Sequence, residues 1–455
     1  MGFQQGLSGL NAASKSLDVI GNNIANANTV GFKQAQTQFA DVFANSLSGA
    51  GGGTTVGIGT KVATIAQQFT QGNITATNNP LDIAINGNGF FRMSSNGAVT
   101  YTRNGQFQLD KNGFVVNAQG AQLTGYMANS SGVLSTGSSA PIQINTSDIA
   151  PSQTTAIVAG LNLDSRSLVP GTQKPVATPP VITPIAFSPT DPTSFNSSTS
   201  ISVFDSLGNS HVLQTFYVKV DPVTTPPAVA GTTEWNMFAT VDGNRIDPSG
   251  LTPVGGPAVK FGTLAFDQFG KITSATPAFS ATDPKALKLT IPVNSGAMTP
   301  INNLPAAAPL LVKFDLSASN QYGADFSVNA MTQDGYTAGK LSKFNTAKDG
   351  TIVGSYTNGK TAVLGQVVLA NFTNPNGLQS LGDNQWTETS ASGQALVGPP
   401  NTGGLGVLTS SATEDSNTDL TGELVNMITA QRVYQANAQT IKTQDQVLQT
   451  LVNLR

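Results

Sequence analysis

Apolar residues follow a helical period at the two ends of this chain and a strand-like period between them. Near the N-terminus they recur every three or four positions, at Phe3, Leu7, Leu10, Ala13, Leu17, Ile20, Ile24 and Ala27. Near the C-terminus they form a ladder of fours and threes that only Gln431 and Asp445 interrupt, at Leu420, Leu424, Met427, Tyr434, Ala438, Ile441, Leu448 and Val452. Each ladder draws one apolar stripe, so residues 1–30 and 419–454 are predicted to be helices that need a partner surface.

The lengths and glycine content of these helices leave two interpretations. An unbroken helix over 419–454 is about 54 Å long, and Ser416 with Asp419 fits a capping box at its start. Gly6, Gly9 and Gly21 each weaken the N-terminal helix by about 1 kcal/mol relative to Ala. The two helices either close a large domain as an antiparallel pair, or coil with helices of neighbouring subunits and become ordered only there.

Proline separates the middle of the chain from its ends. Of the 25 prolines, 21 lie between Pro141 and Pro309, and proline breaks helices but is tolerated in turns and at strand edges. Hairpin turns such as Asn104-Gly105 and Asn358-Gly359 recur on both sides of this stretch. We therefore predict a mainly β fold with long terminal α-helices in nested domains. These are a coiled-coil-like helical domain of residues 1–30 and 415–455, a linking region of 31–68, a split β domain of 69–145 and 336–414, and a Pro-rich β domain inserted at 146–335.

Composition excludes several classes of partner. Only 10% of the 455 residues are charged, with 22 basic against 25 acidic and a net charge of -3, and no two basic residues are adjacent. We therefore expect no nucleic-acid partner. No run of 18 apolar residues exists, and the N-terminus lacks the basic and apolar blocks of a cleaved signal, so membrane insertion is not expected. The absence of cysteine removes disulfides, thiol nucleophiles and thiolate metal sites.

Two glycine-rich patterns resemble nucleotide sites but lack the required context. Residues 354–361 match the phosphate-loop pattern GxxxxGK[ST], yet the next segment contains Gly365 and three valines and predicts a strand where a helix is needed. Gly57 and Gly59 begin a dinucleotide fingerprint that fails because position 62 is Val.

The titratable residues give no catalytic constellation either. His211 stands in a strand-like run, with no cysteine and no acidic cluster nearby to complete a triad or a zinc site. Asp325, Asp334 and Asp349 lie beside turns, where Asp is common. A glycosidase stays open at this point, because its two carboxylates can come from any part of a sequence. We predict no enzymatic activity, no metal and no cofactor.

The terminal segments resemble the bacterial flagellar rod and hook proteins. Residues 17–33, LDVIGNNIANANTVGFK, are similar to the N-terminal signature of that family, and residues 423–437 are similar to its C-terminal segment. Further blocks that look like the family lie at 69–72, 81–91 and 101–105. The blocks 349–359 and 364–370 resemble the hook members, and the Pro-rich insert separates this chain from the shorter distal rod members. The resemblance covers about residues 1–130 and 336–455.

The resemblance implies a structural subunit of the flagellar hook, a curved tube that works as a universal joint and transmits motor torque from rod to filament. Its implied partners are further copies of itself, the rod, the hook cap, the hook–filament junction proteins and the flagellar export apparatus. The implied location is the hook and basal body outside the cell, reached through the flagellar secretion channel without a cleaved signal peptide. A distal rod component and a β-rich surface adhesin are the alternatives.

Two sets of candidate residues follow. The first set is expected to pack helices and support assembly, and contains Leu7, Leu10, Leu17, Ile20, Ile24, Leu420, Leu424, Met427, Tyr434, Ile441, Leu448 and Val452. The second set is the family signature that follows the first helix, and contains Asn22, Asn23, Asn26, Asn28, Gly31 and Phe32.

Overall fold

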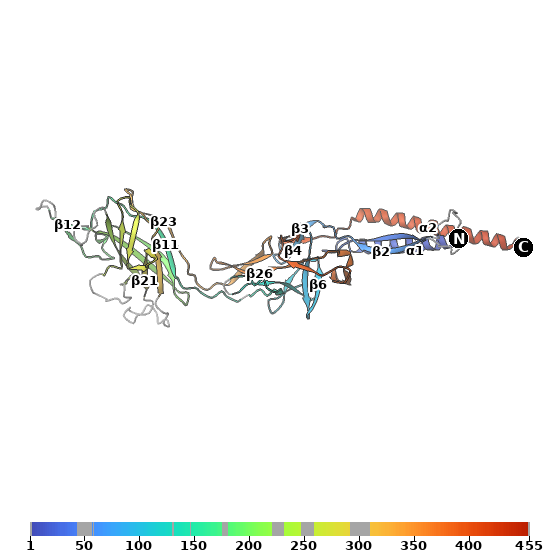
Figure 1. Ribbon diagram of the computed structural model, residues 1–455, viewed down its shortest axis with the longest axis horizontal. Coiled ribbons are helices and arrows are strands. Elements are labelled where there is room, and N and C mark those ends of the chain that lie inside the picture. The colour runs from blue at the N-terminus through green and yellow to red at the C-terminus, as the bar shows by residue number, and fades with distance from the viewer. Residues whose placement is uncertain are drawn as a thin grey trace. The chain divides into compact units, whose positions relative to one another are not determined.

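The computed structural model describes residues 2–42, 57, 59–129, 132–145, 147–174, 181–220, 232–246, 259–291 and 310–453. The chain divides into two compact units, one formed by Met1–Ser147 with Leu341–Arg455 and the other by Asp148–Lys340. Strands dominate both units, and a helix from each end of the chain packs against the other (Figure 1). The predicted fold class, mainly β with paired terminal helices, is confirmed. The finer division of the first unit into helical, linking and β domains stays a prediction.

The terminal helices are α1 (Gly2–Ala25) and α2 (Leu420–Asn453). The first helix is shorter than the predicted stripe, because the side chain of Asn26 donates to the carbonyl oxygen of Asn22 at 3.0 Å and the chain then turns. The predicted capping box is wrong in its partners. Asp419 alone caps α2, accepting a hydrogen bond from the backbone N–H of Thr421 at 3.0 Å, whereas Ser416 accepts one from Thr418 in the preceding turn.

An antiparallel ribbon of two strands follows α1 in the region predicted as a link. It consists of β1 (Ala35–Val42) and β2 (Gly59–Gln67), and both strands pack along α1. A two-stranded ribbon is marginally stable alone, so this ribbon depends on the helix that it covers.

The β part of the first unit joins segments from both sides of the insert. Its main sheet has the strand order β24-β25-β26-β9-β5-β6-β29-β28. The pairing of β9 with β26 ties the two halves into one sheet around a core that includes Ile85, Phe91, Leu123 and Val367. The strands of this sheet are β5 (Phe90–Ser95), β6 (Ala98–Thr102), β7 (Gln108–Leu109), β8 (Val115–Val116), β9 (Gln122–Met127), β10 (Ala140–Pro141), β24 (Leu341–Thr346), β25 (Thr351–Tyr356), β26 (Thr361–Val367), β27 (Leu369–Asn371), β28 (Gln379–Gly382), β29 (Gln385–Thr387) and β30 (Leu396–Gly398). Two smaller pairs are β3 (Ile74–Ala76) with β32 (Ala412–Glu414) and β4 (Ile83–Asn86) with β31 (Val407–Ser410).

The second unit is a sandwich of two sheets. The five-stranded sheet contains β11 (Ala156–Asn162), β20 (Ala278–Ser280), β21 (Asp283–Ile291), β22 (Leu310–Asp315) and β23 (Ser327–Gln333). The six-stranded sheet contains β14 (Ser197–Phe204), β15 (Ser210–Val220), β16 (Thr233–Val241), β17 (Asn244–Ile246), β18 (Gly262–Phe266) and β19 (Ile272–Thr276). A separate hairpin is formed by β12 (Gly171–Lys174) and β13 (Val181–Pro184). Leu161 and Phe314 from the first sheet and Tyr217 and Trp235 from the second share one buried core.

The chain enters and leaves the second unit through adjacent segments. Isolated antiparallel bridges pair Ile149 with Gly339 and Ser152 with Tyr336. This arrangement is what an insertion into a host domain requires, because both ends of the insert must lie close together.

Candidate functional site: an exposed helix pair and its polar junction

The two terminal helices approach each other closely through glycines. A Cβ atom added at Gly6 would lie 2.9 Å from Cγ1 of Ile441, and one added at Gly9 would lie 2.8 Å from the side-chain amide of Asn437. Because a higher number on α1 meets a lower number on α2, the helices are antiparallel. These two glycines therefore allow the close packing of the pair and offset their low helix propensity. Gly21 has no such neighbour within 4 Å.

The helix pair buries only part of the predicted stripes. On α1, Ile20 is buried with Ala12, Ala13 and Val19, while Leu10, Leu17 and Ile24 are half-buried and Leu7 is exposed. On α2 no residue from Leu420 to Asn453 is buried. Met427 and Ile441 are half-buried, whereas five predicted seam residues are between 38% and 74% exposed, namely Leu420, Leu424, Tyr434, Leu448 and Val452. The first helix is thus an incomplete partner for the second.

A groove runs between α1, α2 and the β1–β2 ribbon. Its volume is about 740 Å³. Its apolar lining comes from Ala13 and Val19 of α1, Phe39 of β1, and Ala430 and Val433 of α2. The groove also contains two polar atoms, Oγ1 of Thr37 and Oε2 of Glu423, that are buried and have no hydrogen-bond partner among the described residues.

The family signature joins the end of α1 to the ribbon. The side chain of Asn23 is buried, donates to the carbonyl oxygen of Ala35 at 2.8 Å and accepts from the N–H of Ala35 at 2.9 Å. Gly31 has a φ of +72°, and a Cβ there would lie 2.6 Å from the backbone nitrogen of Asn104. A residue with a side chain is strained at this position and also collides with backbone.

The other signature residues have smaller roles. Asn26 contacts Asn22 within the turn that ends α1, Phe32 is half-buried, and Asn28 is exposed. The structure therefore gives a packing role to Asn23 and Gly31 in particular.

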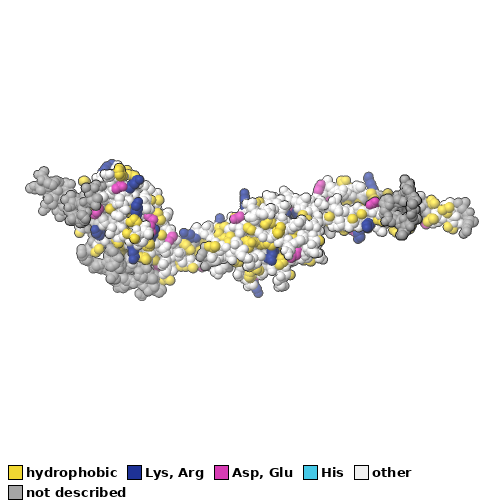
Figure 2. Space-filling view, in the orientation of Figure 1, with side chains coloured by type: hydrophobic (Ala, Val, Ile, Leu, Met, Phe, Trp, Pro, Cys, Tyr) yellow, Lys and Arg dark blue, Asp and Glu magenta, His cyan; other side chains and the backbone are white. Residues whose placement is uncertain are grey.

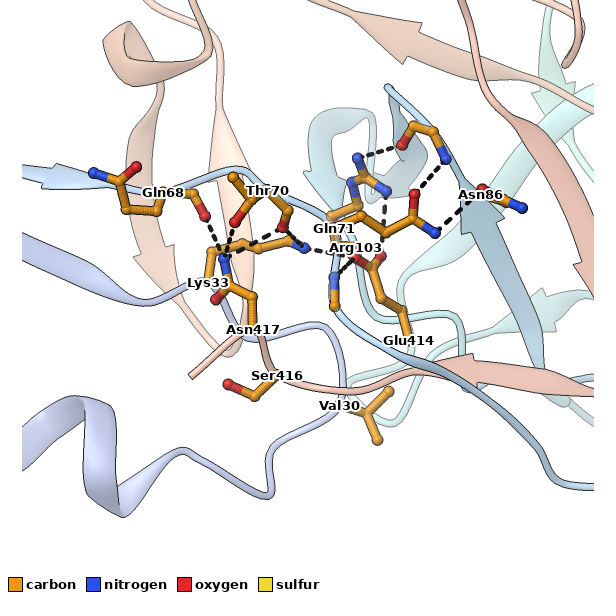
Figure 3. A network of polar contacts seen from close by, with 12 residues as sticks. Val30, Lys33, Gln68, Thr70, Gln71, Asn86, Arg103, Glu414, Ser416 and Asn417 are labelled. Carbon is orange, nitrogen blue, oxygen red and sulfur yellow. Dashed lines mark hydrogen bonds and ion pairs between the residues drawn. The ribbon is translucent and has the colours of Figure 1, made fainter. Parts of the chain in front are cut away.

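A buried ion cluster fastens this signature to the lead-in of α2 (Figure 3). The carboxylate of Glu414 lies 2.6 Å from Nζ of Lys33 and 3.2 Å from Nη1 of Arg103, and all three side chains are almost completely buried. Glu414 also accepts the N–H of Gly72 at 2.9 Å. Lys33 also donates to the carbonyl oxygen of Thr70, and Arg103 donates to that of Gly87. Nε of Arg103 is buried without a hydrogen-bond partner among the described residues. We call Lys33, Arg103 and Glu414 the ion cluster.

Burial governs the electrostatics of the ion cluster. It lowers the pKa of Lys33 and of Arg103, although the negative charge of Glu414 acts in the opposite direction on both. One carboxylate thus compensates two buried cations. Charges removed from water are tolerated only with such partners, so each member depends on the other two.

Further polar contacts connect the same segments. The side chain of Asn417 donates to the carbonyl oxygen of Gln68 at 2.7 Å and accepts from the N–H of Gln34 at 2.8 Å. The indole N–H of Trp386 donates to Oε1 of Gln67 at 2.6 Å. Together with the ion cluster, these contacts fix where both helices leave the β part of the first unit.

Replacing Asn23 with Ala is expected to lower the free energy of unfolding of the first unit by about 1–3 kcal/mol, because both backbone groups of Ala35 lose their partner. The measurement is urea unfolding followed by the fluorescence of Trp386 in a Trp235→Phe background, since these are the two tryptophans of the chain. Asn28→Ala is the matched control, because Asn28 is exposed, and it should change stability by less than about 0.5 kcal/mol. Equal effects of the two substitutions would contradict the assigned role of Asn23.

The phosphate-loop pattern and His211 both lie in β-hairpins. Residues 354–361 form the β25–β26 hairpin, in which the N–H of Gly359 donates to the carbonyl oxygen of Tyr356 at 3.0 Å. His211 lies in β15, and two acidic residues lie close to it. Folding places Oδ2 of Asp242 2.7 Å from its Nδ1, and Asp205 lies near its other nitrogen. No group of three or more His, Asp or Glu residues within the described ranges is arranged to hold a metal ion. Among the described helices, none is long and apolar enough to span a bilayer.

Four family models match this chain. They are described as flagella basal body rod protein (residues 3–33), flagellar hook protein FlgE/F/G D1 domain (84–159), flagellar basal body protein FlaE D2 domain (162–336) and flagellar basal body rod FlgEFG protein C-terminal (409–454). The chain is 43% identical to the flagellar hook protein FlgE of Salmonella typhimurium and 42% identical to that of Escherichia coli, in each case over 100% of both chains. It is 33% identical to the FlgE of Borreliella burgdorferi, over 99% of this chain and 98% of that protein.

A solved structure shares the fold. The crystal structure of Helicobacter pylori flagellar hook protein FlgE2 aligns with a TM-score of 0.50 at 15% identity, and the alignment covers 76% of this chain and 99% of that chain.

Proposed function

This chain belongs to the flagellar hook protein FlgE family and is a structural subunit of the bacterial flagellar hook, and from that premise we propose that the exposed faces of α1 and α2 are the contacts that hold the hook together. The family is structural and not enzymatic. The predicted assembly residues on α2 that α1 leaves exposed, such as Leu424 and Tyr434, are the residues that we assign to contacts between copies.

The observation that carries this proposal is the exposure of α2. Leu424, Val425 and Ile428 are 44%, 59% and 51% exposed, and they lie on neighbouring positions of one helix. Contiguous exposed apolar residues mark interaction surfaces, and fully burying such a side chain stabilises by about 1.5–3 kcal/mol. A helix of 34 residues without one buried residue gains its stability chiefly from a partner outside its own chain.

We assign the predicted domains to layers of the tube. The helical domain of 1–30 and 415–455 lines the inner wall, the split β domain of 69–145 and 336–414 forms the middle, and the insert of 146–335 faces outward. This assignment is supported by the separate core of the second unit and by its paired entry and exit segments. Residues 31–68 contribute the β1–β2 ribbon that accompanies the helices.

The flexibility that a hook needs follows from a difference between the apolar helix faces and the weakly charged outer surface. Figure 2 shows a surface with few and scattered charged side chains, in keeping with the 10% of charged residues in the sequence. Because exposed ion pairs add little to binding, contacts between the outer surfaces of neighbouring copies can form and break at low cost as a curved tube rotates. The apolar helix faces would then hold the tube while the outer surfaces slide, as a universal joint that transmits torque requires.

The partners and the location are proposed on the same basis. Models of rod proteins match both ends of the chain, which supports a junction with the rod at the base of the hook. We propose the hook cap and the hook–filament junction proteins as partners at the other end. We further propose export through the flagellar secretion channel to a site outside the cell, and the absence of cysteine suits a chain that is exported unfolded. The distal rod and adhesin alternatives are not supported, because the relatives that match over the full length are hook proteins.

Placing two charges on the exposed face of α2 tests the proposal. The double substitution Leu424→Lys with Ile428→Lys should leave the monomer folded, since neither residue is buried, and should abolish tube formation, because unpaired charges buried in an interface are strongly unfavourable. The measurement is electron microscopy of basal bodies from cells that express the variant. Leu168→Lys with Phe269→Lys is the control, because these residues of the second unit are 73% and 70% exposed. Normal hooks from the α2 variant would refute the proposal.

A further inference from the structure

The first unit is built from two segments of the chain that residues 148–340 separate in the sequence. Strand β9 pairs with β26, β5 with β27 and β6 with β29, and in each pair one strand precedes the insert and the other follows it. Both cores of the β part also need the two segments. Phe91 packs in one core with Val367, and Tyr101 packs in the other with Phe372. Neither segment can therefore complete a core or the sheet alone.

The second unit, in contrast, is continuous in the sequence. All the strands of its two sheets lie between Ala156 and Gln333, and its buried core is formed by residues from Ile157 to Leu316. A stretch of chain with a core of its own can fold by itself. We therefore expect the second unit to fold without help from the first.

Folding of the second unit brings its two ends together. Strand β11 at its beginning pairs with β23 at its end, so that Ile157 lies opposite Gln333. These two strands are neighbours in Figure 1. Closer to the first unit in the sequence, the backbone N–H of Ile149 donates to the carbonyl oxygen of Gly339 at 2.8 Å. The chain thus enters and leaves the folded second unit at one place.

This junction shortens the loop that the first unit must close. The β9–β26 pairing places Met127 opposite Gly365, and in an unfolded chain it closes a loop of about 240 residues. When Ile149 and Gly339 are already paired, the same contact closes a loop of only about 50 residues. The probability of closing a flexible loop falls roughly as the 3/2 power of its length, so the folded second unit makes the pairing about tenfold more probable.

We propose that the second unit is an intramolecular folding clamp, which folds first, joins its ends at Ile149 and Gly339, and thereby accelerates folding of the first unit about tenfold. Pairing of distant strands is otherwise slow, because the entropy of loop closure is lost before the contacts form. This inference goes beyond the proposed function and does not depend on how the helices contact other copies. A chain that is exported unfolded, as proposed above, would carry its own folding template.

The two tryptophans of the chain report the two units separately. Trp235 is buried in the core of the second unit. Trp386 is buried in the first unit, on β29, which pairs with β6 from the other side of the insert. The full chain with Trp386→Phe and the full chain with Trp235→Phe are unfolded in urea and refolded by dilution, and fluorescence is followed in time. We expect the signal of Trp235 to precede that of Trp386.

Preventing the second unit from folding should slow the first unit. Phe314→Asp places an unpaired charge in the core of the second unit, where Phe314 is completely buried. In the Trp235→Phe background, the rate of the Trp386 signal is expected to fall about tenfold. Phe269→Asp is the matched control, because Phe269 of the same unit is 70% exposed, and it should leave that rate unchanged. Limited proteolysis shows whether residues 148–340 are unfolded in each variant.

A longer connection tests the loop length in a chain whose two units keep their natural cores. Inserting about 50 Gly and Ser residues between Ser147 and Asp148 doubles the loop that remains, so the Trp386 signal should slow about threefold. The same insertion added to Phe314→Asp should slow it by less than about 1.5-fold, because that loop is already about 240 residues long. If Phe314→Asp does not refold at all, the insertion into the natural chain decides alone.

A Trp386 signal that appears before that of Trp235 would overturn this inference. So would a rate that neither Phe314→Asp nor the insertion changes. If Phe314→Asp slows the first unit but the insertion does not, the acceleration has a cause other than loop closure, and the second unit is not a clamp.

Discussion

Substituting Gln for Glu414 is expected to lower the free energy of unfolding of the first unit by about 3–5 kcal/mol, the effect of removing one partner from a buried ion pair. The carboxylate of Glu414 compensates Lys33 at 2.6 Å and Arg103 at 3.2 Å, and an amide leaves both cations buried without a counter-charge. The loss is read from chemical unfolding followed by Trp386 fluorescence, in the Trp235→Phe background.

Two further variants separate charge from other effects of this substitution. Glu388→Gln makes the same chemical change at an exposed residue that accepts a hydrogen bond from Tyr101, and it should alter stability by less than about 0.5 kcal/mol. Adding Lys33→Met to Glu414→Gln removes one of the two buried cations that lack a counter-charge. It should therefore restore part of the lost free energy of unfolding. If the unfolding midpoint of Glu414→Gln were unchanged, or if the double variant regained no stability, the ion cluster would not have the stabilising role assigned to it.

Deleting residues 420–455 is expected to abolish tube formation completely while the rest of the chain stays folded and soluble. The deletion removes α2, which contributes no buried residue to the fold, but it also uncovers Ala12, Ala13, Val19 and Ile20 on α1. We therefore expect α1 to lose helicity in the truncated monomer, because isolated amphipathic helices depend on packing. Electron microscopy and circular dichroism provide the two readouts.

Excision of residues 148–340 is the matched control for that deletion. The chain crosses into and out of the second unit through the paired segments around Ile149 and Gly339, so joining 147 to 341 bridges a short gap. If the helices hold the tube, this much larger deletion should still assemble. Tubes from the α2 deletion, or loss of tubes only on excision of the second unit, would reverse the assignment of the layers.

Periodicity predicted the helices and the strands because those elements depend on local pattern. The spacing of Leu424, Met427 and Ile441 located α2 to within a residue or two of its observed ends. The turn after α1 was missed because the asparagines that end the helix, such as Asn26, interrupt it through side-chain hydrogen bonds that an apolar stripe does not record.

The spacing of apolar residues could not predict the ion cluster and the polar contacts around it. Lys33 and Glu414 are separated by 381 positions, and the neighbours of Glu414 in the sequence include Asp415 but no basic residue that would indicate an ion pair. The signal that was present is the rarity of charge. Lys33 follows a run of uncharged residues from Val19 to Phe32, and such an isolated lysine is a candidate for a buried ion pair. The glycines of α1 were counted as a loss of helix stability, whereas Gly6 and Gly9 serve the approach of α2.

A helical reconstruction by electron cryomicroscopy of tubes assembled from the full chain, at a resolution that shows side chains, tests directly whether the terminal helices hold the tube together. We expect Leu424, Val425 and Ile428 of each copy to be buried against neighbouring copies along the inner wall of the tube. A reconstruction in which these residues face solvent, with contacts between copies confined to residues 148–340, would contradict it.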